Sequence, residues 1–322
     1  MKNSKISVLM SSYNEPIEYV QKAVNSILNQ TYKYFEFIIV IDNPNNSELI
    51  SFLSSTANKD ERIILLINKR NIGLAMSLNR ALSVSTGGFI ARMDADDISK
   101  QERLEHELNY LITNELDVVG CEVDKIDEQG NVLGTIKSYS SKPEIYARML
   151  PFQNVIVHPT VLMKTEAIKS VNGYRNFPSC QDYDLWLRLL SKGYKFGVIP
   201  ENLFQFRRHN ESITATRKFD QFLNESYIRK LFIERKENHG VDSFSDENLK
   251  NYLSKKGFFN QEYANVQNQL LIQYNRGINN IKNHNYKQGL SEVIQSMKSN
   301  AVISNICISL KTHLIRKKYT KR

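Results

Sequence analysis

Three carboxylates stand within four residues at Asp94, Asp96 and Asp97, directly after the apolar run 88–93. Carboxylates this close together repel one another unless a cation neutralises them. Hard oxygen ligands suit Mg²⁺ or Mn²⁺, which keep several bound waters and bridge to phosphates. The cluster therefore predicts a metal-and-diphosphate site at Asp94 and Asp96. Asp97 has a second interpretation, as the N-cap of a helix that begins at Lys100.

Polar side chains also follow other apolar runs of the first hundred residues. Asp42 ends the second run, where a carboxylate either accepts hydrogen bonds from a base or ribose or forms an ordinary Asx turn. Residues 11–15 (SSYNE) follow the first run. The loop 68–73 carries cations and a glycine into a predicted helix, which suits phosphate contact but is also the composition of a plain loop.

The elements that position these side chains alternate along the chain. Apolar runs predict strands, and apolar residues at helical spacing predict helices between them. Strands that alternate with single helices form βαβ units with a mostly parallel sheet, and ligands bind at the carboxyl ends of its strands. We therefore expect the polar clusters to share one rim. The predicted strands are 5–11, 36–42, 62–67 and 88–93, and the predicted helices are 16–29, with Asn14 as its cap, 47–57 and 74–85.

The remainder of the chain divides near residue 212. Up to there, the pattern predicts helix 100–113, a hairpin in 117–134, helix 181–192 and strands at 195–199 and 203–208. Beyond about 215, strand signals disappear and helical spacing continues to the end. We predict an α/β domain at 1–212, with a Rossmann-like mostly parallel sheet flanked by helices. A helical region with a basic tail is predicted at 213–322.

The bulk properties are those of a globular protein. The 322 residues are 41% hydrophobic and 24% charged, without the run of about 20 apolar residues that a membrane helix needs. The N-terminus turns polar too soon for a signal peptide. Cys121, Cys180 and Cys307 form no CxxC pair, which argues against a disulfide framework or zinc site. These features predict a cytoplasmic protein.

The basic residues concentrate at the C-terminus. The net charge is +9, which favours an anionic partner. Residues 311–322 hold six lysines or arginines and no acid, after the apolar residues of 301–310. This pattern predicts peripheral contact with an anionic membrane at the inner face of the cell membrane, or alternatively a packed helix with a frayed tail. We expect no nucleic acid among the partners.

Two nucleotide-binding classes do not fit the loop after the first predicted strand. A dinucleotide-binding dehydrogenase needs GxGxxG there, and a P-loop NTPase needs GxxxxGK[ST]. This loop, SSYNEP, contains no glycine.

The motifs in their order resemble the family 2 glycosyltransferases, inverting enzymes of the GT-A fold. The resemblance covers residues 5–212, and the segments HPT (158–160) and ARMDADD (91–97) resemble the branch that builds bacterial exopolysaccharide, capsule and O-antigen, typified by amylovoran biosynthesis enzymes. Each motif alone is weak, whereas all of them in order are specific. The matching segments are SYNE (12–15), Asp42, NIGL (71–74), LNRA (78–81), DADD (94–97) and QDYDLW (181–186).

The resemblance implies a role for each matching residue. Asp94 and Asp96 would bind the metal, Mn²⁺ or Mg²⁺, and Asp182 would be the catalytic base. His158, His209 and Gln181 are candidates for contacts with the diphosphate or the acceptor. The residues implied to bind the donor nucleotide are Ser12, Tyr13, Asn14, Glu15, Asp42, Asn71 and Asp94.

Two positions depart from the family pattern. Asp42 is followed by Asn43, so this chain has one carboxylate where family members often have two that contact the nucleotide base. Gln181 replaces a common glutamate, which narrows the choice of catalytic base to Asp182, with Asp184 as the weaker candidate.

The resemblance implies an inverting, non-processive, metal-dependent glycosyltransferase. It would move one sugar from a nucleotide-sugar, UDP-linked by resemblance, to a hydroxyl of a glycan or lipid-linked saccharide in cell-surface polysaccharide biosynthesis. The chain has no QxxRW-type motif of processive synthases. Two alternatives stay open. A sugar nucleotidyltransferase would typically place a glycine-rich basic loop after its first strand, and a nucleotide- or lipid-binding protein would use the same fold without turnover.

Overall fold

The computed structural model describes residues 4–140, 142–208 and 218–320. These residues group into two compact units that are not sequential segments of the chain. The first unit comprises 1–148, 154–176 and 188–209, and the second comprises 149–153, 177–187 and 210–322. The predicted boundary between residues 212 and 213 lies outside the described residues, so it stays a prediction.

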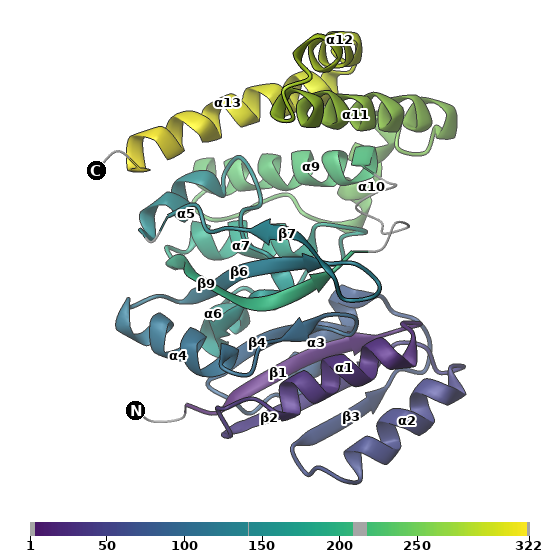
Figure 1. The fold of residues 1–322 in the computed structure, drawn as a ribbon, viewed down its shortest axis with the longest axis vertical. Helices are drawn as coiled ribbons and strands as arrows, with labels where there is room; N and C mark the ends of the chain where they lie inside the picture. The colour runs from purple at the N-terminus through teal and green to yellow at the C-terminus, as the bar shows by residue number, and fades with distance from the viewer. Residues whose placement is uncertain (1–3, 141, 209–217, 321–322) are drawn as a thin grey trace. The chain divides into compact units, whose positions relative to one another are not determined.

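A nine-stranded sheet forms the centre of the first unit (Figure 1). Its order is β3-β2-β1-β4-β8-β6-β9-β5, with β7 beside β6. The strands are β1 (Ile6–Ser12), β2 (Phe35–Ile41), β3 (Ile63–Ile67), β4 (Phe89–Asp94), β5 (Ile98–Ser99), β6 (Val118–Ile126), β7 (Val132–Ile136), β8 (Leu162–Lys164) and β9 (Phe196–Arg207).

Most strands of this sheet run in the same direction. β3, β2, β1 and β4 pair in parallel, and β8 pairs antiparallel with both β4 and β6. β6 therefore runs with β4, and β9 is parallel to β6. Only β5, β7 and β8 of the nine run the opposite way. The prediction of a mostly parallel sheet is confirmed.

Helices cover both faces of the sheet. Figure 1 shows α1 and α2 in front of β1 to β3 and α3 behind them. This follows from the strand order, because the chain steps outward from β1 to β3 and then returns to β4. The helices of this unit are α1 (Ile17–Leu28), α2 (Ser47–Ala57), α3 (Leu74–Val84), α4 (Arg103–Thr113), α5 (Glu144–Met149), the 3-10 turn η1 (His158–Thr160) and α6 (Thr165–Ser170).

Two predicted helix caps are wrong. Pro16 occupies the N-cap of α1 without a side-chain bond, and the Asn14 side chain instead accepts a hydrogen bond from Asn43 at 2.6 Å. Asp97 caps no helix, because the two-residue strand β5 follows it and α4 begins only at Arg103. In both cases a tertiary partner takes the side chain that local spacing assigns to the cap.

The predicted strands at 195–199 and 203–208 are one strand, β9. Its pairing with β6 shifts in register where Cys121 is followed by Glu122 and again at Val123. Pro200 lies at this irregularity, and proline cannot donate to the ladder. The sequence therefore shows a break that the sheet tolerates as a bulge.

A buried carboxylate ties together the starts of three strands. Glu36 of β2 accepts hydrogen bonds from Ser7 Oγ of β1 at 2.6 Å and from Lys5 Nζ at 2.7 Å. It also accepts from the backbone N–H of Thr86, at 2.7 Å, in the turn before β4. Burial raises the pKa of Glu36, but these hydrogen bonds outweigh burial and hold the pKa at about 2, against an ordinary 4.5.

This carboxylate predicts an acid-sensitive contribution to stability. A pKa lower in the folded than in the unfolded state stabilises the fold fully above about pH 4.5, and this contribution is lost as pH falls toward 2. We expect Glu36→Gln to lower the free energy of unfolding at pH 7 by about 1–3 kcal/mol. Urea unfolding at pH 7 and pH 3 measures the effect, with Glu61→Gln on an exposed turn as control. Equal acid losses in wild type and Glu36→Gln would contradict the assignment.

The second unit is mainly helical. The sequence predicts helical spacing beyond about residue 215, and the described residues there confirm it. No described helix is both long enough and apolar enough to cross a membrane. The helices are α7 (Gln181–Ser191), which begins in this unit, α9 (Lys218–Glu237), α10 (Asp246–Lys255), α11 (Gln261–Lys282), α12 (Tyr286–Ser296) and α13 (Asn300–Thr320).

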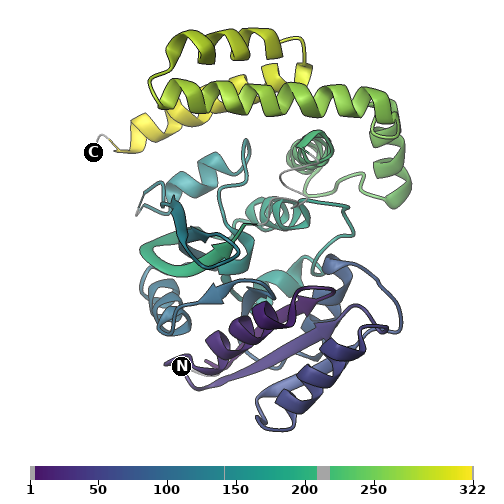
Figure 2. The ribbon, with the colours of Figure 1, turned by 45° about the vertical axis from the view of Figure 1, so that its right-hand side comes forward.

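Two glycines allow α11 and α12 to pack closely. The helices run side by side (Figure 2), and a Cβ on Gly289 would lie 2.7 Å from the carbonyl oxygen of Gly277. The reverse contact, from a Cβ on Gly277 to the Gly289 oxygen, would be 2.9 Å. Any larger residue at either position would force the two helices apart.

Candidate functional site

The predicted polar rim forms at the carboxyl ends of the parallel strands. Ser11 of β1 pairs in register with Asp94 of β4, and Ser12 pairs with Ile41 of β2. The N–H of Asp42 donates to the carbonyl oxygen of Ser12 at 2.8 Å. Polar residues from three strands thus lie together, as the alternation of strands and helices predicts.

The loop after β1 is folded around Glu15. Its Oε2 accepts hydrogen bonds from Ser12 Oγ at 2.6 Å and from Tyr13 N at 2.7 Å. Asn14 is joined to Asn43 after β2. Tyr13, by contrast, is 42% exposed, so its ring is available to a ligand. The donor-binding roles of Ser12, Tyr13, Asn14 and Glu15 stay predictions.

Asp42 organises the loop that precedes α3. Its Oδ1 accepts from Asn68 Nδ2 at 2.7 Å and Ile72 N at 2.9 Å, and its Oδ2 accepts from Gly73 N at 2.8 Å. Gly73 has φ +82°, a conformation that favours glycine. Asn71 is exposed on this loop, with its Oδ1 2.9 Å from Gly73 N. Asp42 therefore shapes the rim, and its contact with a nucleotide base stays a prediction.

The acidic run separates into accessible and internal carboxylates. The side chain of Asp94 is 28% exposed and pairs with the buried Arg92 guanidinium at 2.5 Å. Asp96 is partly exposed, whereas Asp97 is fully buried. Burial raises the pKa of Asp97 well above its ordinary range, and the charges of Asp94 and Asp96 raise it further.

Asp97 accepts a backbone hydrogen bond from strand β9. Its Oδ1 accepts a hydrogen bond from the backbone N–H of Arg207 in β9 at 2.7 Å. Its Oδ2 has no hydrogen-bond partner among the described residues. The run therefore has two partly exposed residues, Asp94 and Asp96, and one buried carboxylate, on Asp97.

The guanidinium of Arg207 holds the acidic loop in place. Its Nε donates to the carbonyl oxygen of Asp96 at 2.9 Å. Its Nη1 donates to the carbonyl oxygens of Asp127 at 2.8 Å and Glu128 at 3.0 Å, in the β6–β7 turn. The guanidinium carbon also lies 4.3 Å from the centre of the Tyr19 ring in α1. Arg207 thus joins three segments, and sequence reasoning missed it.

Arg207→Met should destabilise the protein and disorder the acidic loop. The change leaves three carbonyl oxygens without a buried donor, so we expect a loss of about 2–4 kcal/mol in the free energy of unfolding. Urea denaturation measures it. Arg208→Met is the matched control, because Arg208 is exposed at the next position. Similar stabilities for the two variants would show that the Arg207 contacts are dispensable.

The predicted metal ligands, Asp94 and Asp96, would suit a cation that is bound together with phosphates. Within the described ranges, no group of three or more His, Cys, Asp or Glu side chains is arranged to hold a metal ion. Mg²⁺ in particular is commonly held by one or two carboxylates plus substrate phosphates. Asp94 and Asp96 are two carboxylates at the rim, and their role as metal ligands stays a prediction.

His158 lies in the interior beneath β4. Its Nε2 is 2.8 Å from the Tyr174 hydroxyl, and Asn79 of α3 bonds to both the backbone N–H and the carbonyl oxygen of Tyr174. Burial, with a smaller effect of the nearby Arg92 charge, lowers the pKa of His158 well below its ordinary value. Its contact with diphosphate or acceptor stays a prediction. His209 lies outside the described residues.

Asp182 and Gln181 begin helix α7 in the second unit. Both are partly buried, and the helix N-terminus favours a carboxylate there. The preceding residues pack on α9, since Asn224 Nδ2 donates to Ser179 Oγ at 3.1 Å and Cys180 Sγ is 3.9 Å from the Gln221 oxygen. The catalytic role of Asp182 stays a prediction.

Trp186 and Asp184 point into the protein. Trp186 is fully buried, so it is a core residue rather than a platform for a sugar. Asp184 is also fully buried. Of the two carboxylates considered for the base, Asp182 is therefore the more accessible.

A mostly parallel α/β sheet with an acidic loop after β4 and no glycine-rich loop after β1 is the arrangement that the resemblance to glycosyltransferases of the GT-A type implies. The model of the glycosyl transferase family 2 matches residues 7–171, and the chain belongs to this family. It is a glycosyltransferase enzyme, as the sequence motifs predict.

Several relatives carry the same description. An uncharacterized glycosyltransferase of Methanocaldococcus jannaschii is 36% identical over 72% of this chain and 80% of its own length. The O-antigen biosynthesis glycosyltransferase WbnJ of Escherichia coli is 34% identical over 72% of this chain and 90% of its own. The amylovoran biosynthesis glycosyltransferase AmsE of Erwinia amylovora is 29% identical, over 72% and 86%.

A solved structure shares the fold. The structure of residues 1–349 of S. aureus TarS in complex with UDP-GlcNAc has a TM-score of 0.56 and 14% sequence identity to this chain. The match covers 98% of this chain and 92% of TarS 1–349. At this identity the likeness establishes the fold and no more.

Proposed function

We propose that this enzyme transfers one sugar from a UDP-linked donor to a hydroxyl of a glycan or lipid-linked saccharide, with inversion and without processivity. The pathway class is cell-surface polysaccharide biosynthesis, as in the names of WbnJ and AmsE. One observation carries the proposal. Asp94 ends β4 in register with Ser11 of β1, and Asp96 follows two residues later in the loop.

The first unit binds the donor in this proposal. The exposed Tyr13 ring stacks on the base, and the loop shaped by Asp42 lies where ligands of parallel sheets bind. TarS binds UDP-GlcNAc on the same fold, which supports a UDP-linked donor. The proposed nucleotide-binding residues are Ser12, Tyr13, Asn14, Glu15, Asp42, Asn71 and Asp94.

Asp94 and Asp96 would hold the divalent cation, Mn²⁺ or Mg²⁺, together with the donor diphosphate. A bound cation would stabilise the negative charge on the leaving diphosphate. Arg92 restrains the Asp94 carboxylate through their ion pair, and Arg207 restrains the backbone of Asp96. Both arginines thus position the ligands without touching the donor.

Asp182 removes the proton of the acceptor hydroxyl as that oxygen attacks the anomeric carbon. Its place on the first turn of a helix with a buried apolar face gives it a firm support. Gln181, His158 and His209 are proposed contacts of the diphosphate or the acceptor.

Peripheral membrane contact is a further part of the proposal. Leu310 and Leu314 of α13 are 61% and 66% exposed, and Lys317 and Lys318 stand in the last turn of that helix. An apolar face beside cations suits an anionic lipid surface. A cytoplasmic location at the inner face of the membrane is consistent with this arrangement.

A donor screen tests the proposal. The purified enzyme is incubated with a panel of UDP-, GDP- and dTDP-sugars and Mn²⁺, and nucleotide release is measured with and without EDTA. We expect release from a UDP-sugar that EDTA abolishes. Formation of a nucleoside triphosphate and a sugar 1-phosphate when pyrophosphate is added to the nucleotide-sugar would instead indicate the nucleotidyltransferase alternative. Donor binding without any release would indicate the non-catalytic one.

A further inference from the structure

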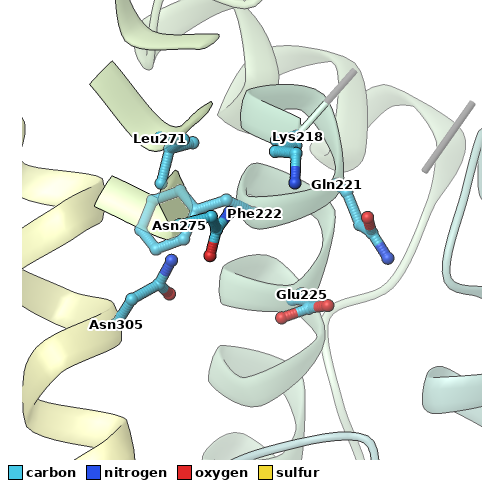
Figure 3. Close-up of a pocket in the computed structure, with 7 residues that line it drawn as sticks. All are labelled: Lys218, Gln221, Phe222, Glu225, Leu271, Asn275 and Asn305. Carbon is cyan, nitrogen blue, oxygen red and sulfur yellow. The ribbon is translucent and has the colours of Figure 1, made fainter. Parts of the chain in front are cut away.

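A polar pocket lies among three helices of the second unit. Its volume is about 190 Å³, smaller than the roughly 300–1,000 Å³ of pockets for drug-sized ligands. In Figure 3 the Phe222 ring points from α9 toward α11 and α13, and the side chains of Asn275 and Asn305 point toward the space beside it. The lining residues are Lys218, Gln221, Phe222, Glu225, Leu271, Asn275 and Asn305.

The lining combines amides with an aromatic ring. The side-chain amides of Gln221, Asn275 and Asn305 line the pocket, and all three residues are partly or largely exposed. Each amide offers two donors and an acceptor. A ligand that carries several hydroxyls on an apolar ring matches this set, because hydroxyls both donate and accept while the ring contacts Phe222 and Leu271.

The charges of the pocket do not favour an anion or a lipid surface. Lys218 is its one cation and Glu225 its one acid among the lining residues. Glu225 pairs with Arg229 one turn further along α9, at 3.3 Å, and its side chain is 27% exposed. A balanced lining of this kind suits an uncharged polar ligand better than a phosphate.

The residues that precede α7 pack against the same stretch of α9. Cys180 Sγ is 3.9 Å from the backbone carbonyl oxygen of Gln221, and the Asn224 side chain donates a hydrogen bond to Ser179 Oγ. Burial raises the pKa of Glu225, and the charge of Asp182 contributes to the increase. Gln221 and Glu225 therefore border both the pocket and the segment that ends at Asp182.

We propose that this pocket is an acceptor subsite that binds one sugar ring of the acceptor saccharide, next to the carboxylate that activates its hydroxyl. The inference rests on the proposed function of Asp182. The pocket binds a sugar ring other than the one that carries the reacting hydroxyl. It therefore determines which acceptor chains are used and leaves hydrolysis of the donor unaffected.

Saturation-transfer NMR tests the subsite with uncharged probes that carry no nucleotide. The probes are the methyl glycosides of glucose, galactose, mannose and N-acetylglucosamine, each added to the full chain. We expect at least one to bind wild type, and Asn275→Ala/Asn305→Ala to weaken that binding by at least about tenfold. Asn279→Ala is the matched control, an exposed asparagine on α11 outside the pocket.

Two further measurements control for loss of folding and for loss of donor hydrolysis. Circular dichroism checks folding, and Gln221→Ala replaces the double variant if that variant is unfolded. Donor hydrolysis in the absence of acceptor should be equal in wild type and variants. If no glycoside binds wild type, or if binding survives loss of the amides, the subsite is wrong. If the glycoside result holds but no nucleotide-sugar is hydrolysed, the proposed function fails instead.

Discussion

Asp96→Ala should lower kcat/KM for transfer by about 10³-fold or more, because it removes one of the two proposed side-chain ligands of the cation. Stabilisation of a leaving diphosphate by a metal contributes several kcal/mol, and about 4 kcal/mol corresponds to 10³-fold. The fold should survive, since the Asp96 side chain is partly exposed. Nucleotide release gives the rate, and calorimetric titration of the donor with and without Mn²⁺ gives the metal dependence of binding.

Asp97→Asn is the matched control for this prediction. Asp97 is buried and its Oδ1 accepts from the backbone of Arg207, a bond that an asparagine oxygen also accepts. We expect this variant to keep Mn²⁺-dependent donor binding. An Asp96→Ala protein that still binds donor in a Mn²⁺-dependent manner would show that the metal ligands lie elsewhere.

Asp182→Asn should lower kcat by about 10²–10⁴-fold, the range that a general base contributes. Donor affinity should be unchanged, because Asp182 is assigned to the acceptor hydroxyl and not to the diphosphate. Single-turnover transfer and donor titration separate the two effects.

Asp184→Asn tests the other carboxylate of the same helix turn. Asp184 is fully buried, so we expect its replacement to affect stability more than transfer. If Asp182→Asn transfers sugar at a near wild-type rate, Asp182 is not the catalytic base. A loss of transfer without a loss of stability in Asp184→Asn would then assign that role to Asp184.

The sequence predicts the parallel half of the sheet well. The ends of the strands and helices from residue 6 to 94 differ from expectation by no more than one residue. This success has a physical reason, because each strand there is a short apolar run and each helix buries one regular stripe. The meeting of Ser12, Asp42 and Asp94 then follows from parallel pairing alone.

The contacts that shape the rim were beyond sequence reasoning. Arg207 is 111 residues away from Asp96, whose carbonyl oxygen it binds, and no local pattern indicates this pairing. Asp42 is spaced like a ligand contact, yet both its oxygens are occupied by the 68–73 loop. Such roles depend on which segments meet in space, and polar spacing alone does not encode that.

The helical region shows the same limit. Helical spacing beyond residue 215 predicts helices but not which faces meet. The close approach at Gly277 and Gly289 and the pocket formed by α9, α11 and α13 both depend on packing between helices. Isolated asparagines on a polar helix, such as Asn275 and Asn305, give no sign in the sequence that they share a cavity.

Real-time proton NMR of donor hydrolysis tests the central claim most directly. The α-linked UDP-sugar selected by the donor screen is incubated with the enzyme and Mn²⁺, with water as acceptor, and the sugar released is observed before its anomers equilibrate. An inverting enzyme that uses Asp94 and Asp96 to hold the diphosphate releases the β-anomer first, and Asp96→Ala releases none. Initial release of the α-anomer, or equal release by Asp96→Ala, would contradict the account.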